Sequence, residues 1–244
     1  MLEVDESKFI FKTRKIWFSE APFDVTGYDG VTFYECTRDV DLKGFSKEEF
    51  TTIVIDLNQD LDTIWKKMDR TCKKYISFAK KSGVIIRLNQ DYDTFYKLNS
   101  EFRKAKGLSD YNLDIGFMKK NGILMVSEYE GNILGGQYYI TDGKNIRGIL
   151  HSSKRLEETG PMNKIISSAS RLMIWEAICY AKEHGMSTYD MGGYYTGKEP
   201  DPQKEGINRF KDSFGGQVVT HYIYQKDYSL LYYIGRKILS LKHG

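Results

Sequence analysis

The sequence predicts an α+β protein built on a mixed, mostly antiparallel sheet, and three observations support this prediction. Three strand patterns follow one another between residues 123 and 151, separated by the turn signals Glu130-Gly131 and Asp142-Gly143. A long helical pattern opened by Pro161 follows them. Another strand pattern comes directly after this helix. A meander followed by a crossover helix and a further strand is typical of a mixed sheet covered by helices.

The part of the chain up to residue 83 combines short strands with one basic helix. Residues 31–34 and 52–57 are short, β-branched segments typical of strands. Apolar residues then recur with the helical period from Leu61 to Ala79. Because Asp60 can cap the start of this pattern and Gly83 can end it, we predict one long helix between them.

From residue 84 onwards, strands and helices alternate in a regular order. The expected elements are a strand (84–88), a helix (91–104), the strands of the meander (123–129, 132–140 and 145–151), a helix (161–183), a strand (187–191), a short helix (206–213), a strand (218–225) and a closing amphipathic helix (228–241). This order predicts a division into a partial segment, residues 1–83, and a complete domain, residues 84–244.

Composition and charge exclude several classes of protein. The chain has 244 residues, with 36 basic and 33 acidic ones, and its formal net charge of +3 neither requires nor excludes an anionic partner. No apolar run approaches the roughly 20 residues of a membrane-spanning helix, and no signal peptide follows Met1, so a cytoplasmic protein without a transmembrane segment is expected. The 3 Cys and 4 His lack metal-ligand spacing, so no metal site is expected.

Two motifs in the last quarter of the chain resemble a known family. Residues 189–193 read Tyr-Asp-Met-Gly-Gly, and residues 206–216 read Gly-Ile-Asn-Arg-Phe-Lys-Asp-Ser-Phe-Gly-Gly. This pair resembles the motifs of the Fem family, the peptidoglycan interpeptide-bridge aminoacyltransferases of the lipid II glycyltransferase type. Residues 65–70 and 79–84 are similar to the family's Trp-to-Arg segment and to its Ala-x-Lys-x-Gly-Val helix end.

The resemblance covers residues 51–225 and implies a fold and an activity. The fold is that of the GNAT acyltransferases, in which two neighbouring strands of the sheet diverge. Complete Fem enzymes carry two GNAT-like domains, so residues 1–83 would be a partial or degenerate copy of the first. The implied activity is N-acyl transfer from an activated donor to a primary amine of a cell-wall or sugar-linked acceptor, such as a peptidoglycan precursor or another small molecule.

The loop at residues 152–160 bears on the choice of donor. GNAT enzymes usually bind the CoA pyrophosphate with backbone N–H groups at this strand-to-helix turn. Here Glu157 and Glu158 would repel a pyrophosphate, and Pro161 lacks an N–H donor. Fem enzymes take the acyl group from aminoacyl-tRNA, so this donor is favoured, acyl-CoA is the alternative, and no tightly bound cofactor is expected.

Lys211 and Asp190 are the candidate catalytic residues. Acyl transfer to an amine passes through an oxyanion, which a positioned cation stabilises. The resemblance implies that the Phe-Lys pair matching Phe210 and Lys211 lies in the substrate channel. Lys211 would polarise the carbonyl, and Asp190 would accept the proton of the amine. The alternatives are an exposed helix lysine and an aspartate that accepts the N–H groups of its own loop.

Other residues are candidates for substrate binding. Gly192 and Gly193 permit close approach of the backbone. Tyr194 and Tyr195 can line a pocket or pack in the core, and Arg209 can clamp a phosphate or remain solvated. A basic helix face that contacts the phosphates of tRNA or of a nucleotide-linked acceptor, or is only solvated, comprises Lys66, Lys67, Arg70, Lys73 and Lys74.

The closing helix and the wider class of function leave alternatives open. Residues 228–241 predict an amphipathic helix that lies on a membrane surface, docks on the sheet or contacts a partner subunit. No DNA partner is expected, and neither the acceptor nor the oligomeric state follows from the sequence. A GNAT-fold protein that binds a ligand without turnover is the competing class.

Overall fold

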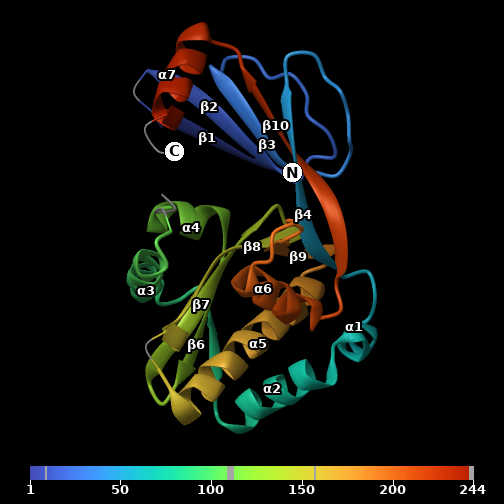
Figure 1. Cartoon of the computed structure of the whole chain (residues 1–244), viewed down its shortest axis with the longest axis vertical. Coiled ribbons are helices and arrows are strands. Elements are labelled where there is room, and N and C mark those ends of the chain that lie inside the picture. Colours follow the sequence, from blue (N-terminus) through green and yellow to red (C-terminus); the bar gives the residue numbers. More distant parts are fainter. Residues whose placement is uncertain (9, 109–112, 157, 242–244) are drawn as a thin grey trace. The chain divides into compact units, whose positions relative to one another are not determined.

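The computed structural model describes residues 1–8, 10–108, 113–156 and 158–241, and Figure 1 shows its elements. Contacts between residues divide the chain into two compact units, Met1–Thr52 with Val218–Gly244, and Ile53–Gln217. Strand β4 (Ser46–Asp56) leads from the first unit into the second, and β10 (Gln217–Asp227) leads back.

The second unit contains a sheet whose strands are mostly antiparallel. The strands lie in the order β9 (Thr188–Gly193), β8 (Asn145–Ser153), β7 (Asn132–Thr141), β6 (Gly122–Tyr129) and β5 (Ile85–Leu88), with the second part of β4 next to β9. β5 to β8 are antiparallel to one another, whereas β8 and β9 are parallel. The parallel pair is possible because helix α5 (Gly160–Glu183) crosses over between these two strands.

Helices cover both faces of this sheet, and the side chains on its two faces contribute to two separate hydrophobic cores. Because successive residues of a strand point to opposite faces, Ile123 and Met125 of β6 join one core and Leu124 and Val126 join the other. The first core includes residues of α2 (Arg70–Lys81) and α5, and the second includes residues of α3 (Tyr92–Ala105) and α4 (Ile115–Asn121). The sheet is therefore the middle of three layers within this unit (Figure 1).

The first unit is a further piece of sheet with one helix. Its strands lie in the order β1 (Leu2–Lys8), β2 (Phe11–Trp17), β3 (Gly30–Cys36), β10 and the first part of β4. A small core includes Ile16, Phe33 and Tyr224, and α7 (Leu230–Leu241) follows β10. In the described ranges of the chain, no helix combines the length and hydropathy that crossing a membrane requires.

The predicted α+β architecture is confirmed, with some local differences. The meander and α5 lie where the sequence patterns place them, whereas α6 (Pro202–Asp212) begins four residues before the helix predicted at 206–213. The prediction of one long basic helix is wrong: α1 (Leu61–Lys67) and α2 are separate, because the side chain of Asp69 accepts the N–H of Cys72 and so caps a new helix. No sequence pattern predicted α4, which Asp114 caps by accepting the N–H of Phe117 at 2.7 Å.

The division into units also differs from the predicted boundary after residue 83. Helix α2 precedes this boundary, yet its residues Cys72, Ile76 and Ala79 share a core with α5. Strand β10 and α7 follow the boundary, yet they belong largely to the first unit. The reason is that packing joins elements that are far apart in the sequence, which local patterns do not record.

Candidate functional site

The parallel ladder between β8 and β9 ends before either strand does. Its register begins with Asn145 and Thr188 and ends with Arg147 and Asp190. Both strands continue beyond this last pair, over residues 148–153 of β8 and 191–193 of β9. The hydrogen-bonded pairing of the two strands therefore begins to open here, as expected for the fold that the motifs implied. Backbone groups beyond the last pair make no hydrogen bonds within this ladder.

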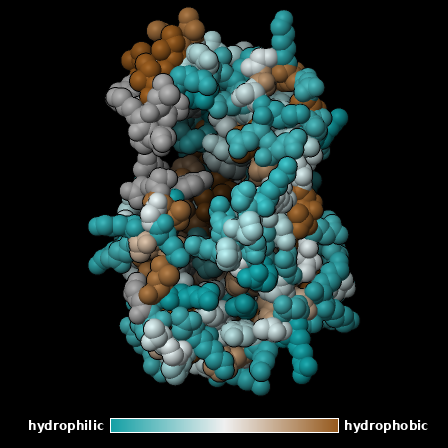
Figure 2. All heavy atoms as spheres, viewed as in Figure 1, coloured by the Kyte–Doolittle hydropathy of each residue, from teal (hydrophilic) through white to brown (hydrophobic). Residues whose placement is uncertain are grey.

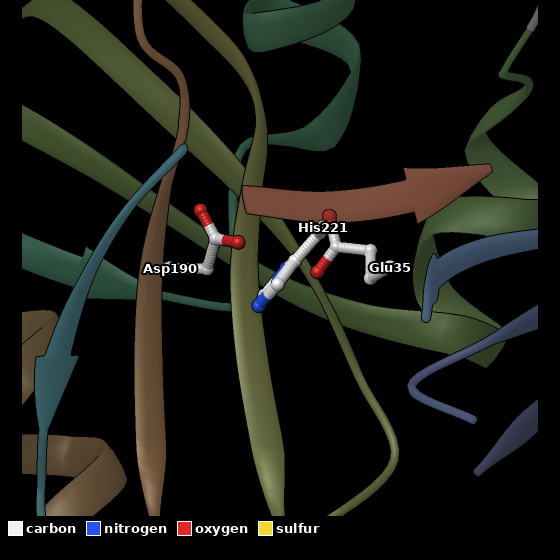
Figure 3. Close-up of side chains that lie close together, drawn as sticks. All are labelled: Glu35, Asp190 and His221. Atoms are coloured by element: carbon white, nitrogen blue, oxygen red, sulfur yellow. The ribbon is translucent and has the colours of Figure 1, made fainter. Parts of the chain in front are cut away.

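The last pair of the ladder is also a buried ion pair. Arg147 Nη1 lies 3.0 Å from Asp190 Oδ2, and the two side chains are 16% and 4% exposed. The other carboxylate oxygen of Asp190 accepts the N–H of Gly192 at 2.6 Å. Figure 3 labels Asp190, whose carboxylate projects from β9. Each oxygen of Asp190 thus accepts from a donor, and the carboxylate holds the turn that follows β9.

Gly192 makes this turn in a backbone conformation that favours glycine. Its φ is +81°, and a Cβ added there would lie 3.4 Å from the carbonyl oxygen of Gly148 and 3.9 Å from Lys211 Nζ. Other residues pay a steric cost at positive φ, so the sequence needs a glycine here. Gly193 has no such requirement, because a Cβ there would meet nothing within 4 Å.

Lys211 of α6 reaches the same turn. Its Nζ donates hydrogen bonds to the carbonyl oxygens of Gly192, at 2.9 Å, and Gly193, at 2.5 Å. Burial lowers the pKa of the Lys211 ammonium to about 8; the carboxylate of Asp190 opposes this shift and the charge of Arg147 adds to it. An ammonium has three N–H donors, so one remains for a further oxygen atom.

Polar contacts hold α6 beside the segment that follows β9. No residue of α6 is fully buried, and its start is capped by Asp201. The amide of Asn208 accepts the N–H of Tyr195 at 3.0 Å and donates to the carbonyl oxygen of Tyr195 at 2.7 Å. The hydroxyl of Tyr194 donates to Asp212 at 3.1 Å. These contacts fix α6 relative to β9 and thereby direct Lys211 to the turn.

The ring of Phe210 is surrounded by three side chains. Phe214 meets it edge-on with ring centroids 5.6 Å apart, and the ring of His151 on β8 lies 6.5 Å away. The guanidinium of Arg171 on α5 lies 4.8 Å from the centroid of Phe210 and 4.8 Å from that of Tyr75 on α2. Arg171 therefore joins three helices through two cation–π contacts, each worth about 0.5–2 kcal/mol.

Arg171 has no ion-pair partner among the described residues. Its Nη1 donates to the carbonyl oxygen of Ser167 at 3.2 Å, and its buried Nε makes no hydrogen bond within the described part of the protein. Burial lowers the pKa of this guanidinium below its ordinary value. The faces of Phe210 and Tyr75 offset part of the cost of keeping the charge there.

His151 is a neutral group beside the same ring. Burial, and secondarily the charge of Lys211, lowers the pKa of His151 to about 4, so the imidazole is uncharged near pH 7. The His151 side chain is itself exposed, so the shift reflects the protein atoms packed around the ring and not complete exclusion of water. The site therefore combines one cationic amine, one neutral imidazole and a tethered carboxylate.

Comparison with known proteins shows the fold. No model of a protein family matches the sequence, and no curated protein matches it either. A crystal structure of FemX superposes with a TM-score of 0.62 and 13% identity, over 91% of this chain and 83% of that chain. The chain has the fold of FemX. The resemblance to the Fem branch of the GNAT fold, inferred from two motifs, is thus confirmed at the level of the fold.

Two further structures share this FemX-like fold. One is the C-terminal DUF2156 domain of a protein assigned as a lysylphosphatidylglycerol synthetase from Agrobacterium fabrum, with a TM-score of 0.54 and 10% identity over 86% of this chain and 72% of that chain. The other is L-PGS from Bacillus licheniformis, with a TM-score of 0.55 and 13% identity over 82% of this chain and 69% of that chain.

In this FemX-like fold the two motifs of the sequence meet at one place. Strand β9 and the turn after it supply one group of the predicted residues, and the end of α6 supplies the other. The predicted residues that the structure brings together are Asp190, Gly192, Gly193, Tyr194, Tyr195, Phe210 and Lys211.

The remaining predicted residues form solvated faces. The side chain of Arg209 is 71% exposed and lies 3.8 Å from Glu205, one turn earlier on α6. The basic face is divided between α1 and α2, where Lys67 donates to Gln59 and Lys73 donates to the carbonyl oxygen of Lys66 at 3.3 Å. Contact of these residues, or of Arg70 and Lys74, with a phosphate stays a prediction.

Sequence analysis missed three residues of the site: Arg147, His151 and Arg171. Arg147 and His151 had no local signal, because each follows a buried apolar residue of β8, where an alternating strand ordinarily carries polar residues. Arg171 had a local signal, because it is a charged residue within a helix that has ten buried positions. A polar or charged group at such a position is rarely placed there without a partner or a role.

Proposed function

We propose that the protein is an N-acyltransferase that moves an aminoacyl or acyl group from an activated donor to a primary amine. The observation that carries the proposal is the Lys211 ammonium, which two backbone carbonyls hold at the point where β8 and β9 separate. The FemX-like fold supports the same class of reaction, since the Agrobacterium fabrum domain, which shares it, comes from a protein named for a lipid that carries a lysyl group.

The reaction begins with attack of the acceptor amine on the carbonyl carbon of the donor. As the C–N bond forms, negative charge develops on the carbonyl oxygen, where the third N–H of Lys211 can be donated. One such donor stabilises the transition state by about 2.7–4 kcal/mol. The C–O or C–S bond to the donor then breaks, and the proton of the amine passes, directly or through water, to the leaving atom.

Asp190 has a supporting role in this scheme. Its two oxygens accept hydrogen bonds from Arg147 and from the N–H of Gly192, so the carboxylate stabilises the turn that Lys211 contacts. Direct acceptance of the amine proton by Asp190 is the alternative. Binding both substrates in line at the separated strands supplies the remaining acceleration through orientation.

We favour aminoacyl-tRNA as the donor and keep acyl-CoA as the alternative. The segment after β8 folds back on α5, because the amide of Asn163 donates to the carbonyl oxygens of Arg155, at 3.2 Å, and Glu158, at 3.0 Å. Glu158 brings a negative charge to the turn where a pyrophosphate would bind. The acceptor that the Fem resemblance suggests is an amine on a peptidoglycan precursor or another sugar-linked molecule, and we place the reaction in the cytoplasm, where both donors are made.

The test compares the two donors with one acceptor. The purified protein is mixed with a nucleotide-linked peptidoglycan precursor and either radiolabelled aminoacyl-tRNA or radiolabelled acetyl-CoA, and label in the acceptor is counted. We expect transfer from aminoacyl-tRNA, and a loss of about 100-fold or more for Lys211→Ala. Gln203→Ala, a change at an exposed position in the first turn of the same helix, is the matched control. Transfer that is unchanged in Lys211→Ala would remove this lysine from the mechanism.

Thermal unfolding gives a second readout that does not depend on the acceptor. A donor that binds the folded protein raises its Tm in proportion to the logarithm of donor concentration. A rise with aminoacyl-tRNA but no transfer to any amine would favour the competing class, a GNAT-fold protein that binds without turnover.

A further inference from the structure

Helix α7 exposes an apolar face. Leu230 and Leu231 are 73% and 67% exposed, and Tyr233, Ile234 and Ile238 are between 44% and 52% exposed. Leu230, Leu231, Ile234 and Ile238 fall within an arc of about 100° when the helix is viewed along its axis. Figure 2 shows the hydrophobic residues gathered over α7, at the upper left of the view.

The opposite face of α7 is anchored to the first unit, so the apolar face is held outwards. Tyr232 packs edge-on against Phe11 of β2 with centroids 5.4 Å apart, and its ring fills the space beside Gly30. Arg236 Nη2 lies 2.6 Å from Asp227 Oδ2 at the end of β10. Rotation of the helix to bury its apolar face would break both of these contacts.

The residues around the apolar face suit an anionic lipid surface. Residues 228–244 contain no Asp or Glu, whereas Lys237 and Lys242 are basic, and the third basic residue, Arg236, is paired with Asp227 on the anchored face. Lys237 Nζ lies 5.9 Å from the ring of Tyr233 at one edge of the apolar arc. Lysine and tyrosine at the edge of an apolar stripe are the residues that anchor interfacial helices, because each has an apolar body and a polar end.

A further exposed apolar residue of the first unit lies in the turn between β1 and β2. Ile10 is 81% exposed and precedes Phe11, whose ring contacts Tyr232 of α7. This exposed isoleucine thus lies one residue from the contact through which Tyr232 anchors α7.

We propose that α7 is an interfacial helix that docks the protein on an anionic lipid bilayer, with Leu230, Leu231, Ile234 and Ile238 inserted among the lipids. The helix has 12 residues and is therefore about 18 Å long. This is shorter than the roughly 30 Å of a bilayer core, so the helix lies in the interface and does not span it. The inference is independent of the proposed function.

A second copy of the chain is the weaker candidate for the occupant of this face. A stable interface between proteins buries about 800 Å² on each partner. One face of a helix about 18 Å long and 10 Å wide offers a footprint several times smaller. The uniform positive charge of residues 228–244 would also bring like charges together across a two-fold axis, whereas it attracts anionic headgroups.

The experiment is flotation of the full chain with two kinds of vesicle, one of phosphatidylcholine alone and one of three parts phosphatidylcholine to one part phosphatidylglycerol. We expect binding to the mixed vesicles, weaker binding to phosphatidylcholine, and a decrease as salt is added. Leu231→Ser/Ile234→Ser should bind the mixed vesicles at least about tenfold more weakly, because two buried apolar side chains are lost.

The matched control is Ile85→Ser/Leu88→Ser, which removes two exposed apolar side chains from β5 of the second unit. We expect it to bind vesicles as the parent does, and circular dichroism checks that each variant keeps its helix content. Absence of parent binding to the mixed vesicles, or equal binding by both double variants, overturns the proposal. So does a dimer, seen by light scattering, that Leu231→Ser/Ile234→Ser converts to a monomer without vesicles present, since α7 would then join two copies.

Discussion

Arg147 and Asp190 are partners twice over: they form the last residue pair of the β8–β9 ladder, and their side chains form an ion pair of 3.0 Å. This places one positive and one negative group beside the ammonium of Lys211, whose pKa they shift in opposite directions. The backbone pairing thus determines where the two charges stand, and the charges help to determine the protonation of the candidate catalytic amine.

The first prediction is that Asp190→Asn and Arg147→Met move the pKa of Lys211 in opposite directions. Loss of the carboxylate removes an interaction that raises this pKa, so Asp190→Asn lowers it further below about 8. Loss of the guanidinium removes an interaction that lowers it, so Arg147→Met raises it towards the ordinary value. The measurement is the rate at which acetic anhydride labels Lys211 as a function of pH, read by mass spectrometry.

Each single variant should also be less stable by about 3–5 kcal/mol, because it leaves one buried charge without its partner. The double variant Arg147→Met/Asp190→Asn serves as the control, since it removes both charges and should recover part of that stability. If the pKa of Lys211 moved in the same direction in both single variants, a change in the burial of the amine, and not the loss of either charge, would explain the shift.

The second prediction concerns two adjacent glycines with different roles. Gly192→Ala places a Cβ at a φ of +81°, close to the carbonyl oxygen of Gly148 and to Lys211 Nζ. We expect a loss of stability of about 1–2 kcal/mol in chemical denaturation, because an L residue is strained there. We also expect a fall in transfer rate, because the carbonyls that hold Lys211 would move.

Gly193→Ala is the control for the same change one residue later. A Cβ at Gly193 meets nothing within 4 Å, so this variant should unfold within about 0.5 kcal/mol of the parent, the usual range for surface changes. Equal stability and activity of the two variants would contradict the account of the turn given above.

The fold was predictable from the sequence wherever local chemistry determines the element. The turns Glu130-Gly131 and Asp142-Gly143 separate β6, β7 and β8 as expected, and Pro161 stands in the first turn of α5. The break between α1 and α2 was missed, because the apolar period continues through Asp69 although its side chain starts a new helix. The pairing of β3 with β10 was also missed, because strands that are distant in the sequence leave no local signal of their partner.

The candidate site was predictable as far as its motifs extend. Asp190, Gly192 and Lys211 belong to two motifs, and the structure joins those motifs through the hydrogen bonds of Lys211. Arg171 and His151 lie outside the motifs, on α5 and β8, and reach Phe210 only through packing. A single sequence does not show which surrounding side chains close around a motif, so these partners required the structure.

The third prediction is that Arg171 positions Lys211 through the ring of Phe210. Arg171→Lys keeps a positive charge but loses the planar group that lies over Phe210 and Tyr75, and Arg171→Gln loses the charge as well. In both variants we expect α6 to be held less firmly against α2 and α5, since no residue of this helix is fully buried. Transfer should fall about tenfold in kcat for Arg171→Gln, with a smaller effect on KM.

The readout that separates positioning from general destabilisation is hydrogen exchange of α6 at a temperature where each variant is folded. Faster exchange confined to residues 202–212 would agree with a positioning role. The same increase throughout the second unit, or a change in KM alone, would contradict it. Arg209→Gln, on an exposed face of the same helix, controls for loss of a nearby positive charge.

The fourth prediction concerns the response of stability to acid. The pKa of His151 is about 4 in the folded protein and near its ordinary value of 6.5 in the unfolded chain. Between these two values the unfolded chain binds a proton that the folded protein does not, so this group costs stability as the pH falls from 6.5 to 4. His151→Asn cannot bind that proton, so its free energy of unfolding should decrease less steeply over this interval.

Urea denaturation at several pH values measures how steeply the free energy of unfolding of the parent and of His151→Asn depends on pH, and His184→Asn controls for loss of an imidazole elsewhere. Parallel curves for the parent and His151→Asn would show that the ring is as easily protonated in the folded protein as in the unfolded chain, and that the surroundings of Phe210 are more open to water than the described packing implies.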